Sequence, residues 1–244
     1  MNKKTEEPYL SIVIPAYNEE AVIRNTLEKV AEYLEGRYPS YEIIVVCDGC
    51  KDNTAGLAEG ATKAHNKIRV LDRKNNMGKG FSVRQGCLEA KGSYIIFTDA
   101  DLSTPIEEIK KLLKWLKDSY DIAIGSRALK ESDIQIRQPW YRETMGKIFN
   151  LFVQAVTVRG ISDTQCGFKG FKKDAAKEVF KRQTINGFGF DVELLYIARR
   201  LGYSIKEVPV RWLNRPASRV NPLVHPVKML YDLLKIRIKG MGKS

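Results

Sequence analysis

The sequence predicts an α/β fold in which a mainly parallel sheet is flanked by helices. Two observations carry this prediction. Short runs of β-branched and other apolar residues alternate with helical stretches through the first half of the chain, which is typical of a doubly wound sheet. The length of 244 residues, with 43% hydrophobic and 29% charged residues, is enough for one large domain or two small ones, of which a single domain is the simpler interpretation. We therefore expect one α/β domain with an elaborated C-terminal third.

In the first half we expect five strands, at residues 10–14, 41–46, 68–71, 94–98 and 122–124. Helices are expected in the segments between them. The clearest helix start follows the fourth strand. Thr104 is a capping residue type, Pro105 suits the first helical position and Glu107 the third, which is the pattern of a capping box. Apolar residues then recur at helical spacing from Ile109 to Leu116. We expect a helix that begins at this box.

The second half is less regular. We expect an amphipathic stretch at 140–158, a loop and strand at 165–171, a helix at 190–200, a strand at 204–210 and a final helix at 224–238. The sequence contains no internal repeat and no Gly/Ser-rich linker. The predicted organisation is one α/β domain over residues 1–222, followed by a basic amphipathic helix and tail over residues 223–244.

The chain carries a formal net charge of +12, and the positive excess is concentrated near its C-terminus. Residues 199–244 contain eleven Lys or Arg residues against Glu207 and Asp232, a local excess of +9. A basic surface of this kind suits an anionic partner, such as nucleic acid, a phosphorylated substrate or an acidic lipid surface. The alternative is a charged face that contacts only solvent.

Four cysteines indicate a reducing compartment rather than a disulfide framework. Cys47 and Cys50 form a CxxC pair, but a zinc site needs about four ligands, and the sequence has no second CxxC and no paired histidines. No apolar run approaches the roughly 18–20 residues of a membrane-spanning helix, and residues 1–8 are polar. We expect a cytoplasmic protein, at most peripheral to a membrane, without a zinc or redox site.

Polar loops follow four of the expected strands, at residues 15–20, 48–52, 75–80 and 99–101. The carboxyl ends of parallel strands share one edge, where open α/β sheets bind ligands. Asp99 and Asp101 leave an apolar strand one residue apart, so their carboxylates can converge on one hard cation that shares its shell with substrate phosphates. Aspartate is also common in turns, and the position after the strand favours the ligand role. We expect Mg²⁺ or Mn²⁺ at this pair.

Several enzyme classes are disfavoured by the motifs that the sequence lacks. Gly78-Lys79-Gly80 can bring backbone and the charge of Lys79 to a phosphate, but it lacks the spacing and the trailing Ser or Thr of a Walker A loop. No GxGxxG follows the first strand, and His65 and His225 stand beside no acidic or nucleophilic motif. There is no recognisable DNA-binding or RNA-binding module, so nucleic acid is not an expected partner.

Five motifs resemble those of the family 2 glycosyltransferases with the GT-A fold. They are the segments 11–19 (SIVIPAYNE), 99–101 (DAD), 125–127 (GSR), 163–169 (DTQCGFK) and 190–195 (FDVELL). The motifs of the first half are general to the family, whereas the last two are characteristic of its polyprenyl-phosphate branch. The match covers nearly the whole chain and is most similar to the dolichyl-phosphate glucosyltransferases. It implies a Rossmann-like, mixed and mainly parallel sheet.

The resemblance also implies roles for individual residues. The nucleoside pocket would be lined by Pro15, Tyr17, Glu19 and Asp48. The metal and the donor diphosphate would bind at Asp99, Ala100 and Asp101, with Lys79 as a further donor contact. The basic residues facing the donor diphosphate or the acceptor phosphate would be Arg127, Arg142 and Arg219. Asp163 would position the acceptor or assist as a base.

Two departures from the family pattern concern the second loop and the membrane. Cys47 stands where an acidic residue is common, and Cys50 where serine is usual, which weakens the expectation of a base contact at the neighbouring Asp48. Related enzymes also often carry a membrane-spanning segment, and no apolar run of that length is present here.

The implied reaction is the transfer of a hexose, with inversion, from a nucleotide diphosphate sugar to a dolichyl or polyprenyl monophosphate. We expect glucose and a UDP-linked donor. The acceptor phosphate is already anionic, so catalysis would depend on alignment and charge stabilisation rather than on an obligatory base. Three alternatives remain open: a GDP-linked mannosyl donor, a polysaccharide or soluble acceptor, and a nucleic-acid-binding protein without enzymatic activity.

The expected final helix is basic and amphipathic. Its apolar face consists of Val227, Leu230, Tyr231, Leu234 and Ile238. A neighbouring polar stripe contains Lys228, Asp232, Lys235 and Lys239. Such a helix can lie in the headgroup region of an anionic membrane, or it can pack its apolar face on the sheet. Because the implied acceptor is a lipid, we expect attachment to the cytoplasmic face of a membrane.

Overall fold

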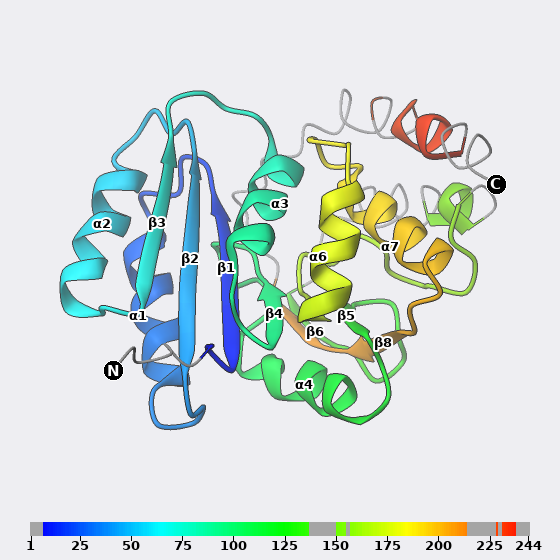
Figure 1. Ribbon diagram of the computed structural model, residues 1–244, viewed down its shortest axis with the longest axis horizontal. Helices are drawn as coiled ribbons and strands as arrows, with labels where there is room; N and C mark the ends of the chain where they lie inside the picture. The colour runs from blue at the N-terminus through cyan, green and yellow to red at the C-terminus, as the bar shows by residue number, and fades with distance from the viewer. Residues whose placement is uncertain (1–6, 137–149, 155–156, 214–227, 229–230, 238–244) are drawn as a thin grey trace, which may run out of the picture.

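The computed structural model describes residues 7–136, 150–154, 157–213, 228 and 231–237. Its centre is a seven-stranded sheet in the order β3-β2-β1-β4-β7-β5-β8 (Figure 1). The strands are β1 (Leu10–Ala16), β2 (Tyr41–Asp48), β3 (Ile68–Arg73), β4 (Tyr94–Phe97), β5 (Ile122–Ser126), β7 (Lys169–Lys172) and β8 (Ile205–Pro209). Neighbours pair in parallel except at β7, which is antiparallel to β4 and β5. The expected mixed, mainly parallel sheet is confirmed.

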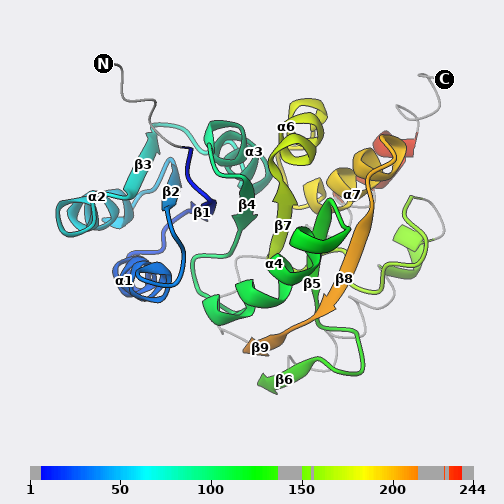
Figure 2. The same cartoon turned by 60° about the horizontal axis from the view of Figure 1, so that its bottom comes forward.

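Helices cover both faces of this sheet (Figure 2). One face carries α1 (Ile23–Leu34), α2 (Thr54–Ala64) and α4 (Ile109–Asp118). The other carries α3 (Lys79–Glu89), α6 (Lys173–Arg182) and α7 (Phe190–Arg200). Within β2, Ile43 and Val45 pack towards the first layer, and Ile44 and Val46 towards the second. Because both faces are buried, the central strands are continuous apolar runs rather than alternating ones.

The sheet is built outward from β1 in both directions. β2 pairs with one side of β1 and β4 with the other, so the strand order reverses at the junction of β1 and β4. Such a reversal opens a crevice at the carboxyl edge, which is where open α/β sheets bind ligands. The four polar loops, at 15–20, 48–52, 75–80 and 99–101, follow parallel strands and therefore meet at this edge.

The predicted capping box is wrong. The chain enters α4 through a 3-10 turn, η1 (Ile106–Glu108), and the preceding Pro105 is extended, with ψ 144°, and caps the turn without a side-chain hydrogen bond. The Thr104 hydroxyl instead lies 3.9 Å from Cys166 Sγ. The carboxylate of Glu107 forms an ion pair with Arg211, with Oε2 and Nη2 3.5 Å apart. Tertiary contacts therefore engage both side chains that the local pattern assigned to the cap.

In the second half, the structure has α7 and β8 where a helix and a strand are expected. The loop and strand expected at 165–171 are confirmed, with residues 165–168 in a loop and the strand beginning at Lys169. A short second sheet is formed by β6 (Asp133–Ile136) and β9 (Arg211–Leu213), visible at the bottom of Figure 2. Neither of these strands is predicted by the sequence, because three or four residues are too few for a periodic signal.

The last described residues, 231–237, are helical and have two apolar sides. Leu233 and Ile236 are buried in the core cluster that also contains residues of α3, α6 and α7. Tyr231 and Leu234 are 58% and 54% exposed. The helix therefore packs on the domain while part of the predicted apolar stripe faces solvent. The other members of that stripe lie outside the described residues: Val227, Leu230 and Ile238.

Residues 150–154 form a second short helical segment with the same character. Val153 is buried, whereas Leu151 and Phe152 are 66% and 50% exposed. Most of the amphipathic stretch expected at 140–158 lies outside the described residues. In the part of the chain that the structure describes, no helix combines the length and the apolar character needed to cross a membrane.

Leu233→Ala should lower the free energy of unfolding by about 2–5 kcal/mol, the usual cost of truncating a buried leucine. Leu234→Ala, one position further on the exposed side, is the matched control and should change it by less than about 0.5 kcal/mol. Urea unfolding followed by circular dichroism measures both. Equal and small effects would show that residues 231–237 do not pack as part of the core.

Candidate functional site

The loops after β1 and β2 are tied together at the carboxyl edge. The amide of Glu19 donates to Thr54 Oγ1 at 2.7 Å, and the amide of Lys51 donates to Asn18 Oδ1 at 2.7 Å. The loop that contains Tyr17 and Glu19 is therefore fixed against the loop that follows β2. Both side chains are half-buried, whereas Pro15, the third residue expected to line a nucleoside pocket from β1, is buried.

Asp48, the last residue of β2, is buried and holds the loop after β3. Its carboxylate accepts hydrogen bonds from the amides of Met77 (2.7 Å) and Gly78 (2.8 Å) and pairs with Arg73. The resemblance implies that Asp48 contacts the nucleobase. Through these contacts Asp48 shapes the loop that leads to Lys79, and its contact with a nucleobase stays a prediction.

Two glycines let this loop approach the segment before α7. Gly78 has φ +101°, and a Cβ there would overlap the carbonyl oxygen of Asn186. The amide of Gly80 donates to the same carbonyl at 2.8 Å. The first residue of α3, Lys79, is thus held by its backbone on both sides. Its ammonium lies 2.6 Å from Asp99 Oδ1.

Asp99 and Asp101 lie just beyond the end of β4, and both carboxylates are held in place. The backbone of Gly167 lies so close to Asp99 that a Cβ at this position would overlap Asp99 Oδ2. Asp101 accepts hydrogen bonds from the amide (2.9 Å) and the hydroxyl (2.8 Å) of Ser103. Burial and the charge of Asp99 raise the pKa of Asp101. Two fixed carboxylates that repel each other are suited to sharing a divalent cation.

The backbone between the two aspartates is anchored to the helix layer below. Ala100 is buried, and its carbonyl accepts a hydrogen bond from the hydroxyl of Thr26 in α1 at 2.6 Å. Leu102, just after the pair, has a positive φ of 48°. The chain therefore turns sharply directly after the two aspartates.

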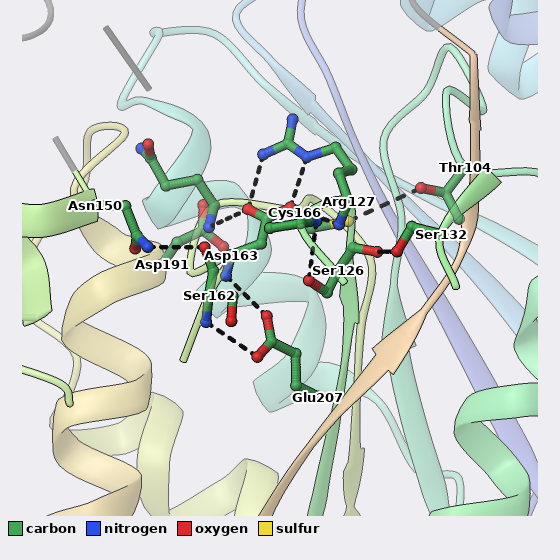
Figure 3. A network of polar contacts seen from close by, with 12 residues as sticks. Thr104, Ser126, Arg127, Ser132, Asn150, Ser162, Asp163, Cys166, Asp191 and Glu207 are labelled. Carbon is green, nitrogen blue, oxygen red and sulfur yellow. Dashed lines mark hydrogen bonds and ion pairs between the residues drawn. The ribbon is translucent and has the colours of Figure 1, made fainter. Parts of the chain in front are cut away.

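A second charged pair joins the loop after β5 to the loop before β7 (Figure 3). Arg127 donates to Asp163 from Nε (2.7 Å), from Nη2 (2.8 Å) and from its amide (2.9 Å). Burial would raise the pKa of Asp163, but the charge and the hydrogen bonds of Arg127 outweigh it and lower the pKa to about 2. A carboxylate with so low a pKa is a weak proton acceptor. The geometry therefore favours positioning, rather than base catalysis, by Asp163.

The backbone of the Asp163 loop is fixed from β8. The carboxylate of Glu207 accepts hydrogen bonds from the amides of Ser162 (3.0 Å) and Asp163 (2.8 Å). Figure 3 shows Arg127 on the opposite side of Asp163 from Glu207. Asp163 uses Nε and Nη2 of Arg127, and within the described part of the chain no acceptor lies at the Nη1 amino group. The guanidinium also lies over the ring of Trp212, 5.5 Å from its centroid.

A third pair is buried, and the sequence patterns assign no role to its members. Lys169 Nζ lies 2.5 Å from Asp191 Oδ1 and 2.6 Å from the carbonyl oxygen of Cys166. The pair connects the start of β7 to the first turn of α7. Lys169 and Asp191 lie within two of the motifs that resemble the family, 163–169 and 190–195, and the resemblance gives neither residue a role of its own. The negative charges of Asp99 and Asp191 both raise the pKa of Lys79. The Lys79–Asp99 and Lys169–Asp191 pairs therefore belong to one electrostatic cluster.

Arg142 and Arg219 lie outside the described residues, and their roles stay predictions. Cys47 is buried and Cys50 half-buried, and both are free thiols. Burial raises the pKa of Cys47 to about 12, which disfavours the reactive thiolate at neutral pH.

Comparison with known proteins assigns the sequence to a family. The model of the family described as "Glycosyl transferase family 2" matches residues 11–180. The chain is 38% identical to the dolichyl-phosphate beta-glucosyltransferase of Drosophila melanogaster, over 94% of this chain and 74% of that one. It is 36% identical to the protein of the same name from Homo sapiens (94% and 75%), and 34% identical to that of Saccharomyces cerevisiae (96% and 75%).

Among solved structures, the chain is similar to glucosyl-3-phosphoglycerate synthase from Mycobacterium tuberculosis in complex with Mn²⁺, UDP and glucosyl-3-phosphoglycerate. The TM-score is 0.69 at 20% identity, over 95% of this chain and 79% of that one. A second structure of that enzyme holds Mg²⁺ and UDP, with a TM-score of 0.69 at 19% identity, over 95% and 79%. At these identities the similarity shows the shared fold.

Asp163→Asn should lower the free energy of unfolding by about 2–3 kcal/mol at neutral pH, below the 3–5 kcal/mol of a fully buried pair because the Arg127 side chain is 29% exposed. The folded-state pKa of Asp163, about 2, is lower than the ordinary value near 3.9. The pair therefore stabilises the fold above about pH 4, and this contribution is lost as the pH falls towards about 2. Denaturation at a series of pH values should show the gap between variant and wild type closing over that interval.

The matched control is Asp118→Asn, on an exposed position of α4, which should change stability by less than about 0.5 kcal/mol. A gap between Asp163→Asn and wild type that does not depend on pH would contradict the charged pair.

Proposed function

The chain belongs to glycosyltransferase family 2, and from this we propose that it is an inverting glucosyltransferase that moves glucose from UDP-glucose to dolichyl or a related polyprenyl monophosphate. The observation that carries the proposal is the cluster of acidic and basic side chains at the carboxyl edge of the sheet. Its members are Lys79, Asp99, Asp101 and Arg127. Curated relatives that match nearly the whole chain are dolichyl-phosphate beta-glucosyltransferases, which supports glucose and the lipid phosphate.

The donor site would use the loops after β1, β2 and β4. Tyr17 and Glu19 are half-buried beside the edge and would line the nucleoside pocket, while Asp48 would keep the loop after β3 in shape. The similar fold of glucosyl-3-phosphoglycerate synthase, solved with UDP and with UDP-glucose, supports a uridine donor. GDP-linked mannose is the alternative that a donor assay separates.

Asp99 and Asp101 fit a divalent cation, Mg²⁺ or Mn²⁺. Both carboxylates are held by the surrounding backbone, and burial together with the charge of Asp99 raises the pKa of Asp101. Carboxylate oxygens are the ligands that these hard cations prefer, with phosphate oxygens completing the shell. When bound, the ion would supply positive charge to the donor diphosphate. The protein's own contribution to that charge would come from Lys79 and Arg127.

The acceptor phosphate would provide the nucleophile. One of its oxygens attacks C1 of the glucose, the bond from C1 to the nucleoside diphosphate breaks, and inversion gives the β-linked lipid product. Since a phosphate monoester is largely anionic near neutral pH, no side chain has to accept a proton, which agrees with the low pKa of Asp163. The work left to the protein is alignment and the stabilisation of charge on the leaving diphosphate, for which Nη1 of Arg127 is available.

We also propose that the enzyme attaches to the cytoplasmic face of a membrane through anionic lipid. The exposed side chains of Tyr231 and Leu234 share their helix with Lys235, and Lys228 is exposed one turn earlier. Leu151 and Phe152 are also exposed, and both segments lie at the α7 end of the molecule in both views (Figures 1 and 2). Exposed apolar side chains next to lysines suit an anionic bilayer surface.

A cavity of about 440 Å³ supports the placement of a lipid phosphate next to this surface. Its lining residues come from the loop after β3, the segment before α7 and the C-terminal helix. Its lining includes Gly78, Asn186, Lys228, Asp232 and Lys235. Gly78 immediately precedes Lys79, so the cavity adjoins the proposed donor site, and its two lysines offer positive charge on the side of the proposed membrane contact.

The purified chain, supplied with radiolabelled UDP-glucose, dolichyl phosphate and Mn²⁺, should transfer glucose into the organic-solvent phase. Asp101→Asn should reduce the rate by at least about 100-fold, because a ligand of the metal and diphosphate is lost, while circular dichroism shows an intact fold. EDTA should stop the wild type, and Mg²⁺ or Mn²⁺ should restore it. Asp118→Asn should retain the full rate.

Each failure of this assay has its own meaning. Transfer from GDP-mannose but not from UDP-glucose would replace the donor, and transfer only to a polysaccharide or a soluble acceptor would replace the acceptor. An Asp101→Asn variant that is fully active in EDTA would overturn the metal site. Tight, salt-sensitive binding to DNA with no response to nucleotide sugars would overturn the enzymatic function.

Replacing Tyr231 and Leu234 together by serine should weaken co-sedimentation with phosphatidylserine vesicles by about tenfold or more, because the two side chains lose apolar area that the bilayer would bury. Wild-type binding should also weaken in high salt, since exposed charges are screened over about 8 Å at physiological ionic strength. Leu201→Ser, at a 38% exposed position at the end of α7, is the matched control. Undiminished vesicle binding by the double variant would exclude this helix as the membrane contact.

A further inference from the structure

Lys79 neutralises a carboxylate that would also have to bind a cation. Its ammonium lies 2.6 Å from Asp99 Oδ1. The second carboxylate, of Asp101, accepts hydrogen bonds from Ser103 and takes part in no ion pair among the described residues. A divalent ion shared by the two aspartates would therefore compete with Lys79 for Asp99.

The carboxylate of Asp99 and the backbone of Lys79 are both held in place by their surroundings. The backbone of Gly167 confines Asp99, because it lies so close that a Cβ added at Gly167 would overlap the Asp99 carboxylate. The backbone of Lys79 is confined too, because the amide of Gly78 donates to Asp48 and the amide of the next glycine donates to the segment before α7. The flexible part is the four-carbon side chain of Lys79 itself.

The pair is open enough to exchange partners. The side chains of Lys79 and Asp99 are 25% and 34% exposed, whereas those of Lys169 and Asp191 in the neighbouring pair are 0% and 6% exposed. Separating the buried pair would leave two charges without water or partner, which is costly. Separating Lys79 from Asp99 returns both groups to solvent or to an incoming ligand.

We propose that Lys79 is an exchangeable counter-ion: it neutralises Asp99 while the donor site is empty, and its ammonium passes to the donor diphosphate when the metal and nucleotide enter together. The inference rests on the proposed function, because it requires a divalent ion at the two aspartates and a diphosphate beside them. It adds that the same lysine opposes the metal alone and favours the metal with its nucleotide.

The physical basis is the sign of the charges. An ammonium and a divalent cation that touch the same carboxylate repel each other across a few ångströms. The oxygens of a diphosphate can contact both cations, and a charge-assisted hydrogen bond from Lys79 to such an oxygen replaces the one lost at Asp99. By linkage, a group that weakens one ligand alone and strengthens the pair makes the two ligands bind cooperatively.

Lys79→Met should therefore change two affinities in opposite directions. Mn²⁺ alone, titrated with the free ion followed by electron paramagnetic resonance, should bind about threefold tighter or more, because its competitor is gone. UDP in saturating Mn²⁺, measured by calorimetry, should bind about tenfold weaker or more, because a charge-assisted contact is lost. Lys79→Arg keeps the charge and should bind Mn²⁺ much as the wild type does. Lys63→Met, at an exposed position near the end of α2, controls for the loss of one positive charge elsewhere.

The outcomes separate this inference from the function on which it rests. Mn²⁺ affinity that is unchanged or weaker in Lys79→Met overturns the counter-ion role and leaves the proposed function in place, since a plain phosphate ligand would affect UDP alone. A folded wild type that binds neither Mn²⁺ nor UDP overturns the proposed function and the exchange together. If thermal unfolding shows that Lys79→Met is not folded, Lys79→Gln is measured by the same two criteria.

Discussion

Charge compensation at the carboxyl edge of the sheet is the constraint on which this site depends. In the cluster around Lys79, three carboxylates have a basic partner: the pairs are Asp99 with Lys79, Asp163 with Arg127, and Asp191 with Lys169. A desolvated carboxylate without a partner is costly, so each pair also fixes the chain segments that carry it. The first pair joins the start of α3 to the end of β4, and the second joins the loop after β5 to the loop before β7. The third joins β7 to α7. The fold and the site are therefore stabilised by the same contacts.

Asp101 is the carboxylate of this cluster whose negative charge is not balanced by a basic partner among the described residues. Its carboxylate accepts two hydrogen bonds from Ser103, and among the described residues it has no ion pair. Hydrogen bonds from a neutral residue hold its position without cancelling its charge. The carboxyl edge thus retains negative charge at the one place where the proposed metal would bind, and positive charge at Lys79 and Arg127 where the proposed phosphates would lie.

The sequence predicts those parts of the fold that depend on local periodicity and on the geometry of parallel strands. The apolar runs identify β1 to β5, and their common direction places Asp99, Asp48 and Lys79 at one edge. The partners inside the site are not local. Arg127 and Asp163 are 36 residues apart, and they meet because the antiparallel strand β7 returns beside β5. The capping box fails for the same reason, since Thr104 has a partner, Cys166, 62 residues away.

The C-terminal helix connects this cluster to the proposed membrane surface. Leu233 and Ile236 are buried in the core cluster that also contains Phe190 at the start of α7, next to Asp191. A helix anchored on that side cannot rotate about its axis, so Tyr231 and Leu234 are presented outward at a fixed position relative to the sheet edge. If these side chains enter a bilayer surface, the orientation of the whole domain is set by the packing beneath them. An acceptor phosphate confined to the headgroup layer would then meet the arginine and lysine side chains at a defined height, which supplies part of the alignment that the reaction requires.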